Sequence, residues 1–122
     1  MAKDIKLLAP AANPGIATYT SADIENGQGR GVKVVVDITA VGGGATLTVT
    51  LQGKDPLSGK YYTLLASAAL GAAATTVIFI FPGAPVAANV SANDALPATW
   101  RVSAALAVAN NMTFTIGASI LD

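Results

Sequence analysis

The side chains that most often perform chemistry in proteins are scarce in this sequence. It contains no Cys and no His. Disulfides, thiol redox chemistry, zinc sites built from Cys and His, and catalytic triads that use His are therefore excluded. Its six Ser residues occur without a Ser-x-x-Lys motif, so no activated nucleophile is recognisable. We expect a protein that is not an enzyme and that binds no cofactor.

Two aspartates near expected turns, Asp55 and Asp94, are the only acids that could meet to bind a hard cation. Such a site needs several more oxygen ligands, and no calcium-loop spacing is present. Asp55 precedes Pro56 and Asp94 follows Asn93, which is typical of residues that open turns. We interpret both as turn residues and expect no metal site.

The glycine-rich segment Gly27-Gln28-Gly29-Arg30-Gly31 is superficially similar to a phosphate-binding loop. A P-loop requires GxxxxGK[S/T] between a strand and a helix. Here the next segment is rich in β-branched residues, which favours a strand. We therefore interpret the segment as a flexible connection.

Aromatic and arginine side chains are the remaining candidates for binding. A lone Trp at the start of a strand, such as Trp100, is typical of a core anchor whose indole N–H is paired with the backbone. Arg101 then points to the opposite face, where Arg is favoured at subunit interfaces. Tyr61 and Tyr62 place one ring on each face of their strand. They either cover the sheet or form part of a sugar-binding platform, which an aromatic content of 6% does not favour.

A threonine-rich sheet face is the last candidate site, formed by Thr46, Thr48 and Thr50 with Thr113 and Thr115. It lacks the Lys and Glu residues that usually protect sheet faces and edges from pairing. We therefore expect another chain to cover such a face or edge. The residues that we predict at an interface with another chain are Arg101, Tyr61, Thr46, Thr48 and Thr50.

The charge content also indicates a covered surface. The 122 residues are 52% hydrophobic and 11% charged, with a formal net charge of zero. Electrostatic capture of nucleic acid or of an anionic membrane needs a basic face, so neither partner is expected. A folded monomer would expose roughly 6,000 Å², or about 430 Å² for each charge, and a sparsely charged neutral surface tends to associate.

A membrane-spanning helix is the alternative explanation of this composition, because no charge occurs between Lys60 and Asp94. Leu64 to Phe81 has 18 residues, which is near the minimum for a spanning helix. Its second half is β-branched and aromatic and ends at Pro82-Gly83, which favours a strand and a turn. No signal peptide is visible in residues 1–15. We therefore expect no membrane partner.

The elements that position these side chains are strands. We predict a single all-β domain, a β-sandwich or jelly-roll-like barrel of about seven or eight short strands. It spans residues 16–122 and follows an N-terminal arm of residues 1–15. Within the arm, Ile5 to Leu8 is either a short strand or lies on a neighbouring subunit. The other expected strands are Ile16–Thr20, Val32–Ala40, Ala45–Gln52, Tyr61–Ala68, Thr75–Phe81, Thr99–Ala107 and Met112–Ile120.

Glycine, proline and asparagine mark the connections between these strands. Gly42-Gly43-Gly44 is expected to join its two flanking strands into a hairpin. Lys54 to Lys60 contains the Asp, Pro and Gly of a second turn. Pro82 to Pro97 is a 16-residue connection, long enough to cross between sheets or to form an exposed functional loop. Asn110-Asn111 is expected to form a turn.

The phrases LQGKDPLSGKYYTLLASA (51–68), NDALPATWRV (93–102) and FTIGAS (114–119) resemble small β-rich structural proteins encoded among the virion genes of tailed bacteriophages, particularly capsid decoration proteins. The likeness covers roughly Val32 to Leu121. It implies a non-enzymatic virion component, assembled in the host bacterial cytoplasm, that binds the major capsid protein lattice as a homotrimer where neighbouring capsomers meet. These proteins share no contact motif that transfers binding residues to this chain.

Other functions remain open at this point. The same β-rich composition suits a tail tube, a head–tail connection or a fibre base, because a sandwich does not choose among such roles. A carbohydrate-binding module would use Tyr61 or Tyr62 with polar residues of the connection from Pro82 to Pro97. Ala2 to Thr20 lies outside the resemblance, and a capsid-clamping or subunit-swapping role for it is a hypothesis.

Overall fold

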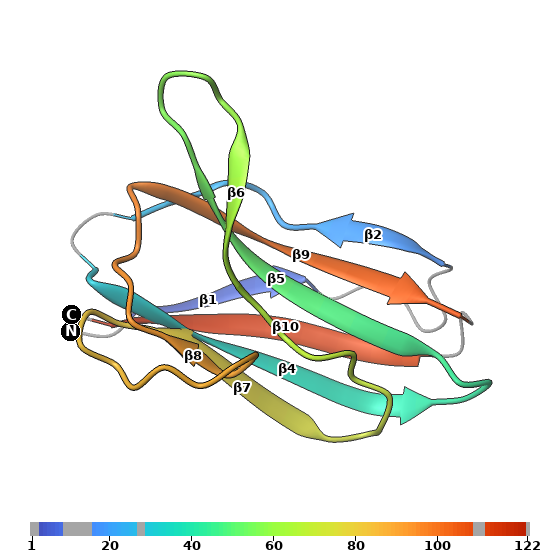
Figure 1. Ribbon diagram of the computed structural model, residues 1–122. Coiled ribbons are helices and arrows are strands. Elements are labelled where there is room, and N and C mark those ends of the chain that lie inside the picture. The colour runs from blue at the N-terminus through green and yellow to red at the C-terminus, as the bar shows by residue number, and fades with distance from the viewer. Residues whose placement is uncertain (1–2, 9–15, 27–28, 109–111, 122) are drawn as a thin grey trace.

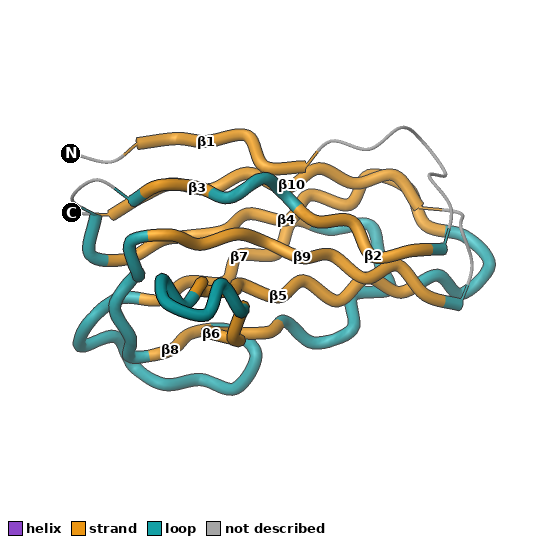
Figure 2. The backbone as a smooth tube through the Cα atoms, turned by 90° about the horizontal axis from the view of Figure 1, so that it is seen from above, coloured by secondary structure: helices purple, strands orange, loops and turns teal. Residues whose placement is uncertain are grey.

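A computed structural model describes residues 3–8, 16–26, 29–108 and 112–121. These residues form ten strands and no helix, arranged as two sheets that pack face to face (Figures 1 and 2). The predicted all-β sandwich is confirmed. Sheet A has the order β1 (Lys3–Leu8), β10 (Met112–Leu121), β4 (Gly31–Val41), β7 (Thr75–Ile80) and β8 (Ser91–Ala92). Sheet B has the order β2 (Ala17–Thr20), β9 (Thr99–Ala107), β5 (Thr46–Lys54) and β6 (Tyr61–Ala66), with β3 (Ile24–Glu25) also paired to β9.

The strand count exceeds the expected seven or eight because of two very short elements. β3 and β8 have two residues each, which is too short for any alternation of polar and apolar residues to be visible. β3 pairs with the start of β9, and β8 runs parallel to the end of β7. Both short strands lie beside longer strands that the sequence does predict.

The glycine run Gly42-Gly43-Gly44 does not close the predicted hairpin. β4 pairs with β10 and β7, whereas β5 pairs with β9 and β6, so the chain crosses here from sheet A to sheet B. Gly43 and Gly44 have φ angles of 65° and 75°, a left-handed backbone that glycine adopts without steric cost. Both strands bury one apolar face, and the two faces meet across the core. Alternation alone does not distinguish this arrangement from side-by-side pairing.

The other two connections behave as predicted. Lys54 to Lys60 joins β5 to β6 as a hairpin, and Figure 1 shows this hairpin projecting away from the sandwich. Pro82 to Pro97 crosses from sheet A to sheet B and contains β8. The expected turn at Asn110-Asn111 lies outside the described residues.

Part of the segment that the sequence assigns to an N-terminal arm lies on the sandwich itself. β1 pairs antiparallel with β10, from Lys3 opposite Ile120 to Leu8 opposite Ile116. Ile5, Leu7 and Leu8 pack against the buried core. Of the two alternatives for Ile5 to Leu8, the structure shows the short strand, at the edge of sheet A.

The core lies between the sheets and is filled by the inward side chains of the predicted alternation. The alternating apolar residues of β4, β5, β9 and β10 are all buried. Trp100 has 0% of its surface exposed, as expected of a core anchor. The expected backbone partner for its indole is wrong: among the described residues, no acceptor lies within hydrogen-bond distance of Nε1. The paired strands already use their backbone acceptors within each sheet.

Candidate interaction surface

The outer face of sheet B carries a field of small uncharged side chains. Leu47, Val49 and Leu51 of β5 point into the core, so the intervening threonines point outward, as predicted. In the register of the sheet, Thr46, Thr48 and Thr50 lie opposite Ala107, Ala105 and Ser103. The three threonines are half-buried by these neighbours. We call these six residues the threonine field.

Thr113 and Thr115 do not belong to this face. They lie in β10, which is a strand of sheet A, and they alternate with buried Met112, Phe114 and Ile116. They therefore face outward on the opposite side of the sandwich. The prediction of one common threonine face is wrong in this part, because the period of two shows which residues point outward and not which sheet they belong to.

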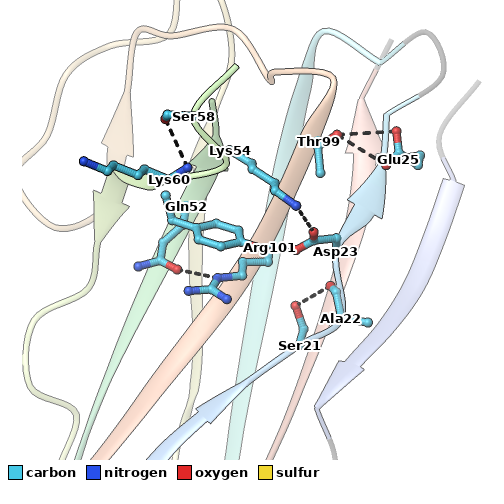
Figure 3. Close-up of polar contacts among 11 residues, drawn as sticks. Ser21, Ala22, Asp23, Glu25, Gln52, Lys54, Ser58, Lys60, Thr99 and Arg101 are labelled. Atoms are coloured by element: carbon cyan, nitrogen blue, oxygen red, sulfur yellow. Dashed lines mark hydrogen bonds and ion pairs between the residues drawn. The ribbon is translucent and has the colours of Figure 1, made fainter. Parts of the chain in front are cut away.

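A polar cluster lies next to the threonine field, where β5, β6 and β9 run side by side (Figure 3). The guanidinium carbon of Arg101 is 3.4 Å from the centre of the Tyr61 ring, and its Nε donates to Oε1 of Gln52 at 2.8 Å. The Tyr61 hydroxyl donates to Oδ1 of Asp23 at 2.7 Å. Lys54 Nζ lies 3.0 Å from Oδ2 of Asp23. We call Asp23, Gln52, Lys54, Tyr61 and Arg101 the Tyr61 cluster.

The register of sheet B assembles this cluster. Gln52 of β5 lies opposite Arg101 of β9, and Lys54 of β5 lies opposite Tyr61 of β6. Side chains directly opposite each other on one sheet face are close enough to interact. Asp23 belongs to the link between β2 and β3. Because β3 pairs with the start of β9, this link lies beside the cluster.

The electrostatics of the cluster follow from these contacts. The hydrogen bond from the Tyr61 hydroxyl, followed by the one from Lys54, lowers the pKa of Asp23 below its ordinary value of 3.8. Asp23 in turn raises the pKa of Lys54 above 10.5. Both side chains are about one-third exposed, so solvent screens the ion pair. One carboxylate and two cations give the cluster a formal charge of +1.

The cluster has the composition of an interaction surface. Tyr and Arg are the side chains enriched at binding hot spots, and Arg101 and Tyr61 are both predicted interface residues. Arg101 uses only Nε for Gln52. Among the described residues, no hydrogen bond from its terminal nitrogens is found, so they can donate to a carboxylate or carbonyl of another molecule. Sequence reasoning missed Asp23 and Lys54 as partners, because Asp23 is 38 residues from Tyr61 along the chain.

Tyr61 and Tyr62 do not form a common platform for a sugar ring. Tyr61 is stacked beneath Arg101. Tyr62 is 45% exposed and lies opposite Gly53, where its ring and Pro97 fill the space that a side chain at residue 53 would need. The two rings point to opposite faces of β6, as expected for neighbouring strand residues.

Asp55 and Asp94 each serve a local turn, as predicted. Asp55 accepts hydrogen bonds from the backbone N–H groups of Leu57 and Ser58 and from the Ser58 hydroxyl. Asp94 accepts one from the N–H of Ala95. In the part of the chain that the structure describes, no three acidic side chains gather as a metal site.

The described end of the glycine-rich segment leads directly into a strand. Gly31 is the first residue of β4, and the guanidinium carbon of Arg30 lies 5.3 Å from the centre of the Phe81 ring. Gly27 and Gln28 lie outside the described residues. The segment is therefore followed by a strand, as predicted, and lacks the helix that a P-loop requires.

Residues 64–81, the candidate membrane helix of the sequence, contain strands. They include the end of β6 and all of β7. Across the described ranges there is no helix of the length and apolarity needed to span a bilayer.

The chain matches no family model, no curated protein and no solved structure.

Proposed function

We propose that this protein is a non-enzymatic structural component of a tailed bacteriophage virion, a decoration protein that binds the outer lattice of the major capsid protein as a homotrimer. The proposal rests first on the resemblance of three sequence phrases to such proteins. It requires no cofactor, nucleic acid or membrane. A decoration protein works by adding buried area across the joints between capsid subunits, so that internal pressure must break more contacts.

The observation that carries the proposal is the threonine field beside the Tyr61 cluster. The field offers a broad uncharged surface, and the cluster places an Arg and a Tyr at its border. This matches the general anatomy of interfaces, in which charge is depleted at the centre and Arg and Tyr are enriched.

The whole surface is consistent with cover by other chains. Fourteen charged side chains share an accessible surface of 6119 Å², or about 440 Å² for each charge. A homo-oligomeric interface of about 2,000 Å² or more would remove a large part of this uncharged surface from water. Closed cyclic symmetry would then allow the same patch to be used by each copy.

The first test is the native mass of the purified protein, measured by light scattering coupled to size exclusion. We expect a stable species of three times 12.1 kDa. A monomer that stays soluble and does not associate at high concentration would contradict the argument from the uncharged surface.

The second test is co-sedimentation in two arms, one with phage heads that lack their decoration protein and one with separated tails. We expect saturable binding to heads, lost in an Arg101→Glu variant and retained in a Lys6→Glu variant on the other sheet. Binding to tails alone would instead favour the tail-tube, connection or fibre-base alternatives.

A further inference from the structure

The outer face of sheet A contains an apolar groove beside its C-terminal strand. The groove has a volume of about 530 Å³. Its lining includes Lys33, Phe79, Phe81, Pro82, Pro85 and Leu121. Phe79 and Leu121 alternate with the buried residues of β7 and β10, so they point away from the core. The groove therefore has an aromatic and proline-rich floor on the outside of the sandwich.

Two cationic side chains, Lys33 and Arg30, lie at this groove. Lys33 is exposed and lines the groove directly. Arg30 stacks over Phe81, one of the lining rings, at 5.3 Å. An apolar floor beside two cationic side chains fits an aliphatic side chain that is accompanied by a carboxylate.

The β5–β6 hairpin presents such a side chain. Leu57 lies at its tip and is 95% exposed, the most exposed of the large hydrophobic side chains that the structure describes. Figure 1 shows the tip standing clear of both sheets. Leu57 therefore makes no use of its apolar surface within its own molecule.

The turn at the tip is closed by hydrogen bonds between its own residues. The Asp55 carboxylate accepts hydrogen bonds from the N–H of Leu57 at 3.2 Å and from the hydroxyl of Ser58 at 2.6 Å. Gly59 closes the turn with a φ of 73°, and its N–H donates to the carbonyl of Asp55 at 2.8 Å. A preordered loop loses little conformational entropy on binding, so the turn is suited to presenting Leu57 to a partner.

The geometry points to a second copy of this chain as that partner: we propose that Leu57 of one molecule inserts into the sheet A groove of the next. The hairpin projects from the sheet B side (Figure 1), whereas the groove is lined by outward-facing residues of sheet A. One molecule therefore cannot fill its own groove. The Asp55 carboxylate, which accepts a hydrogen bond from the N–H of Leu57, is opposite in sign to Lys33 and Arg30 at the groove. Lys60, which pairs with Asp55 across the hairpin, has the same sign as these two cations.

This contact is heterologous, because the two partners use different surfaces. Heterologous contacts generate a closed ring when the rotation between copies closes, and an open filament when it does not. The inference rests on the self-association in the proposed function and specifies which surfaces form it. A ring of three copies would bury all three hairpin tips.

Cysteine cross-linking tests the contact directly, because the natural sequence contains no Cys. Leu57→Cys and Ala84→Cys, at the tip and in the groove lining, are purified separately, mixed and mildly oxidised. We expect a disulfide-linked dimer that contains one copy of each variant. The matched control mixes Leu57→Cys with Val108→Cys. Val108 is 70% exposed and lies near Gly44, at the opposite end of the sandwich, so this pair is not expected to cross-link beyond background.

A charge substitution provides the second measurement. Leu57→Asp is expected to weaken self-association by about tenfold or more, whereas Val108→Asp is expected to leave the native mass unchanged. Both positions are exposed, and the fluorescence of Trp100 confirms that each variant is folded. An unchanged oligomer in Leu57→Asp, together with no specific cross-link, would overturn the hairpin contact while leaving the homo-oligomer intact. A wild-type protein that is monomeric would overturn both proposals.

Discussion

Arg101 and Tyr61 stack across an intervening strand: the guanidinium carbon lies 3.4 Å from the ring centre, although β9 and β6 are separated by β5. Gln52 of β5 completes the bridge by accepting a hydrogen bond from Arg101. Three strands of sheet B are therefore tied together on their outer face at the base of the projecting hairpin. This arrangement fixes the position of the hairpin relative to the threonine field.

The stacking itself makes a measurable contribution to stability. In a double-mutant cycle of Arg101→Met and Tyr61→Leu, we expect a coupling energy of about 0.5–1 kcal/mol in the free energy of unfolding. The measurement is urea denaturation followed by Trp100 fluorescence, at one fixed protein concentration because self-association shifts apparent stability. Strictly additive single effects would show that the two side chains are in contact without stabilising each other.

Lowering the pH should reduce the free energy of unfolding, in part through protonation of Asp23. Its pKa in the folded state lies below 3.8, because the Tyr61 hydroxyl and then Lys54 donate hydrogen bonds to the charged carboxylate. The folded state thus binds this proton less readily than the unfolded chain. The stabilisation is fully present above the unfolded pKa and is lost as the pH falls through the folded pKa. We expect Asp23→Asn to reduce the loss of stability between about pH 6 and about pH 2.5.

The control for this prediction is Tyr61→Phe, which removes the larger of the two causes. The pKa of Asp23 should then rise toward 3.8, as followed by the NMR signal of its carboxyl carbon. An Asp23 titration that is identical in the wild type and in Tyr61→Phe would contradict the assigned hydrogen bond.

The hairpin tip has its own acid sensitivity. The hydroxyl of Ser58, followed by the backbone N–H groups of Leu57 and Ser58, lowers the pKa of Asp55 below 3.8. As for Asp23, the pKa is lower in the folded state than in the unfolded chain, so the carboxylate stabilises the fold when it is charged. Protonation of Asp55 at low pH should therefore weaken the hydrogen bonds of the turn. Hydrogen exchange of the Ser58 and Gly59 amides should accelerate below about pH 4 by more than the intrinsic pH dependence. A Ser58→Ala variant should show this acceleration at a higher pH.

Val108 is a strained residue whose replacement should stabilise the protein. It is β-branched and has a φ of 73°, a conformation that costs roughly 1–2 kcal/mol for an L-residue. The chain already uses Asn at its other non-glycine position of this kind among the described residues, Asn89 with a φ of 64°. We expect Val108→Asn to raise the free energy of unfolding by about 1 kcal/mol.

The matched control is Val86→Asn, because Val86 is also highly exposed, at 79%, and is not among the residues with positive φ. Its effect should stay within about 0.5 kcal/mol. Equal effects of the two substitutions in urea denaturation would argue against strain at Val108.

Gly31 should be intolerant of a side chain. A Cβ atom there would overlap the carbonyl oxygen of Ile80 and would lie 2.7 Å from Cδ2 of Phe81. Because the obstacle is the backbone of β7, Gly31→Ala is expected to destabilise the protein by about 2 kcal/mol. At Gly71 the nearest atom would be 3.7 Å away, so Gly71→Ala should change the free energy of unfolding by less than about 0.5 kcal/mol. Thermal or urea unfolding of the two variants checks the difference.

Local patterns in the sequence predict which side chains are buried, and they do so for a physical reason. The alternation of Thr46, Leu47, Thr48 and Val49 depends only on the pleat of one strand, so it is visible without knowledge of any partner. The same holds for Trp100 and Arg101, which the pleat places on opposite faces of β9.

The pairing of strands depends on contacts between residues that are distant in the chain. Local sequence patterns therefore predict some of these pairings incorrectly. The strands that flank Gly42-Gly43-Gly44 have the pattern of a hairpin, yet they belong to different sheets. The site shows the same limit. Arg101 and Tyr61 could be selected by residue type, but their contact depends on the register of β5 with both neighbours, and Asp23 has no local signal at all.

The position of β10 has a consequence for the order of folding. Residues 112–121 lie between β1 and β4. Among the described strands β1 pairs only with β10, so it has no neighbour until a strand that lies more than a hundred residues later in the chain has been synthesised. Until then β4, the central strand of sheet A, has an unpaired backbone edge along its valine-rich segment. Such long-range pairing is slow and leaves strand edges open to aggregation. We therefore expect the sandwich to close only after synthesis of residue 121, in a single late step.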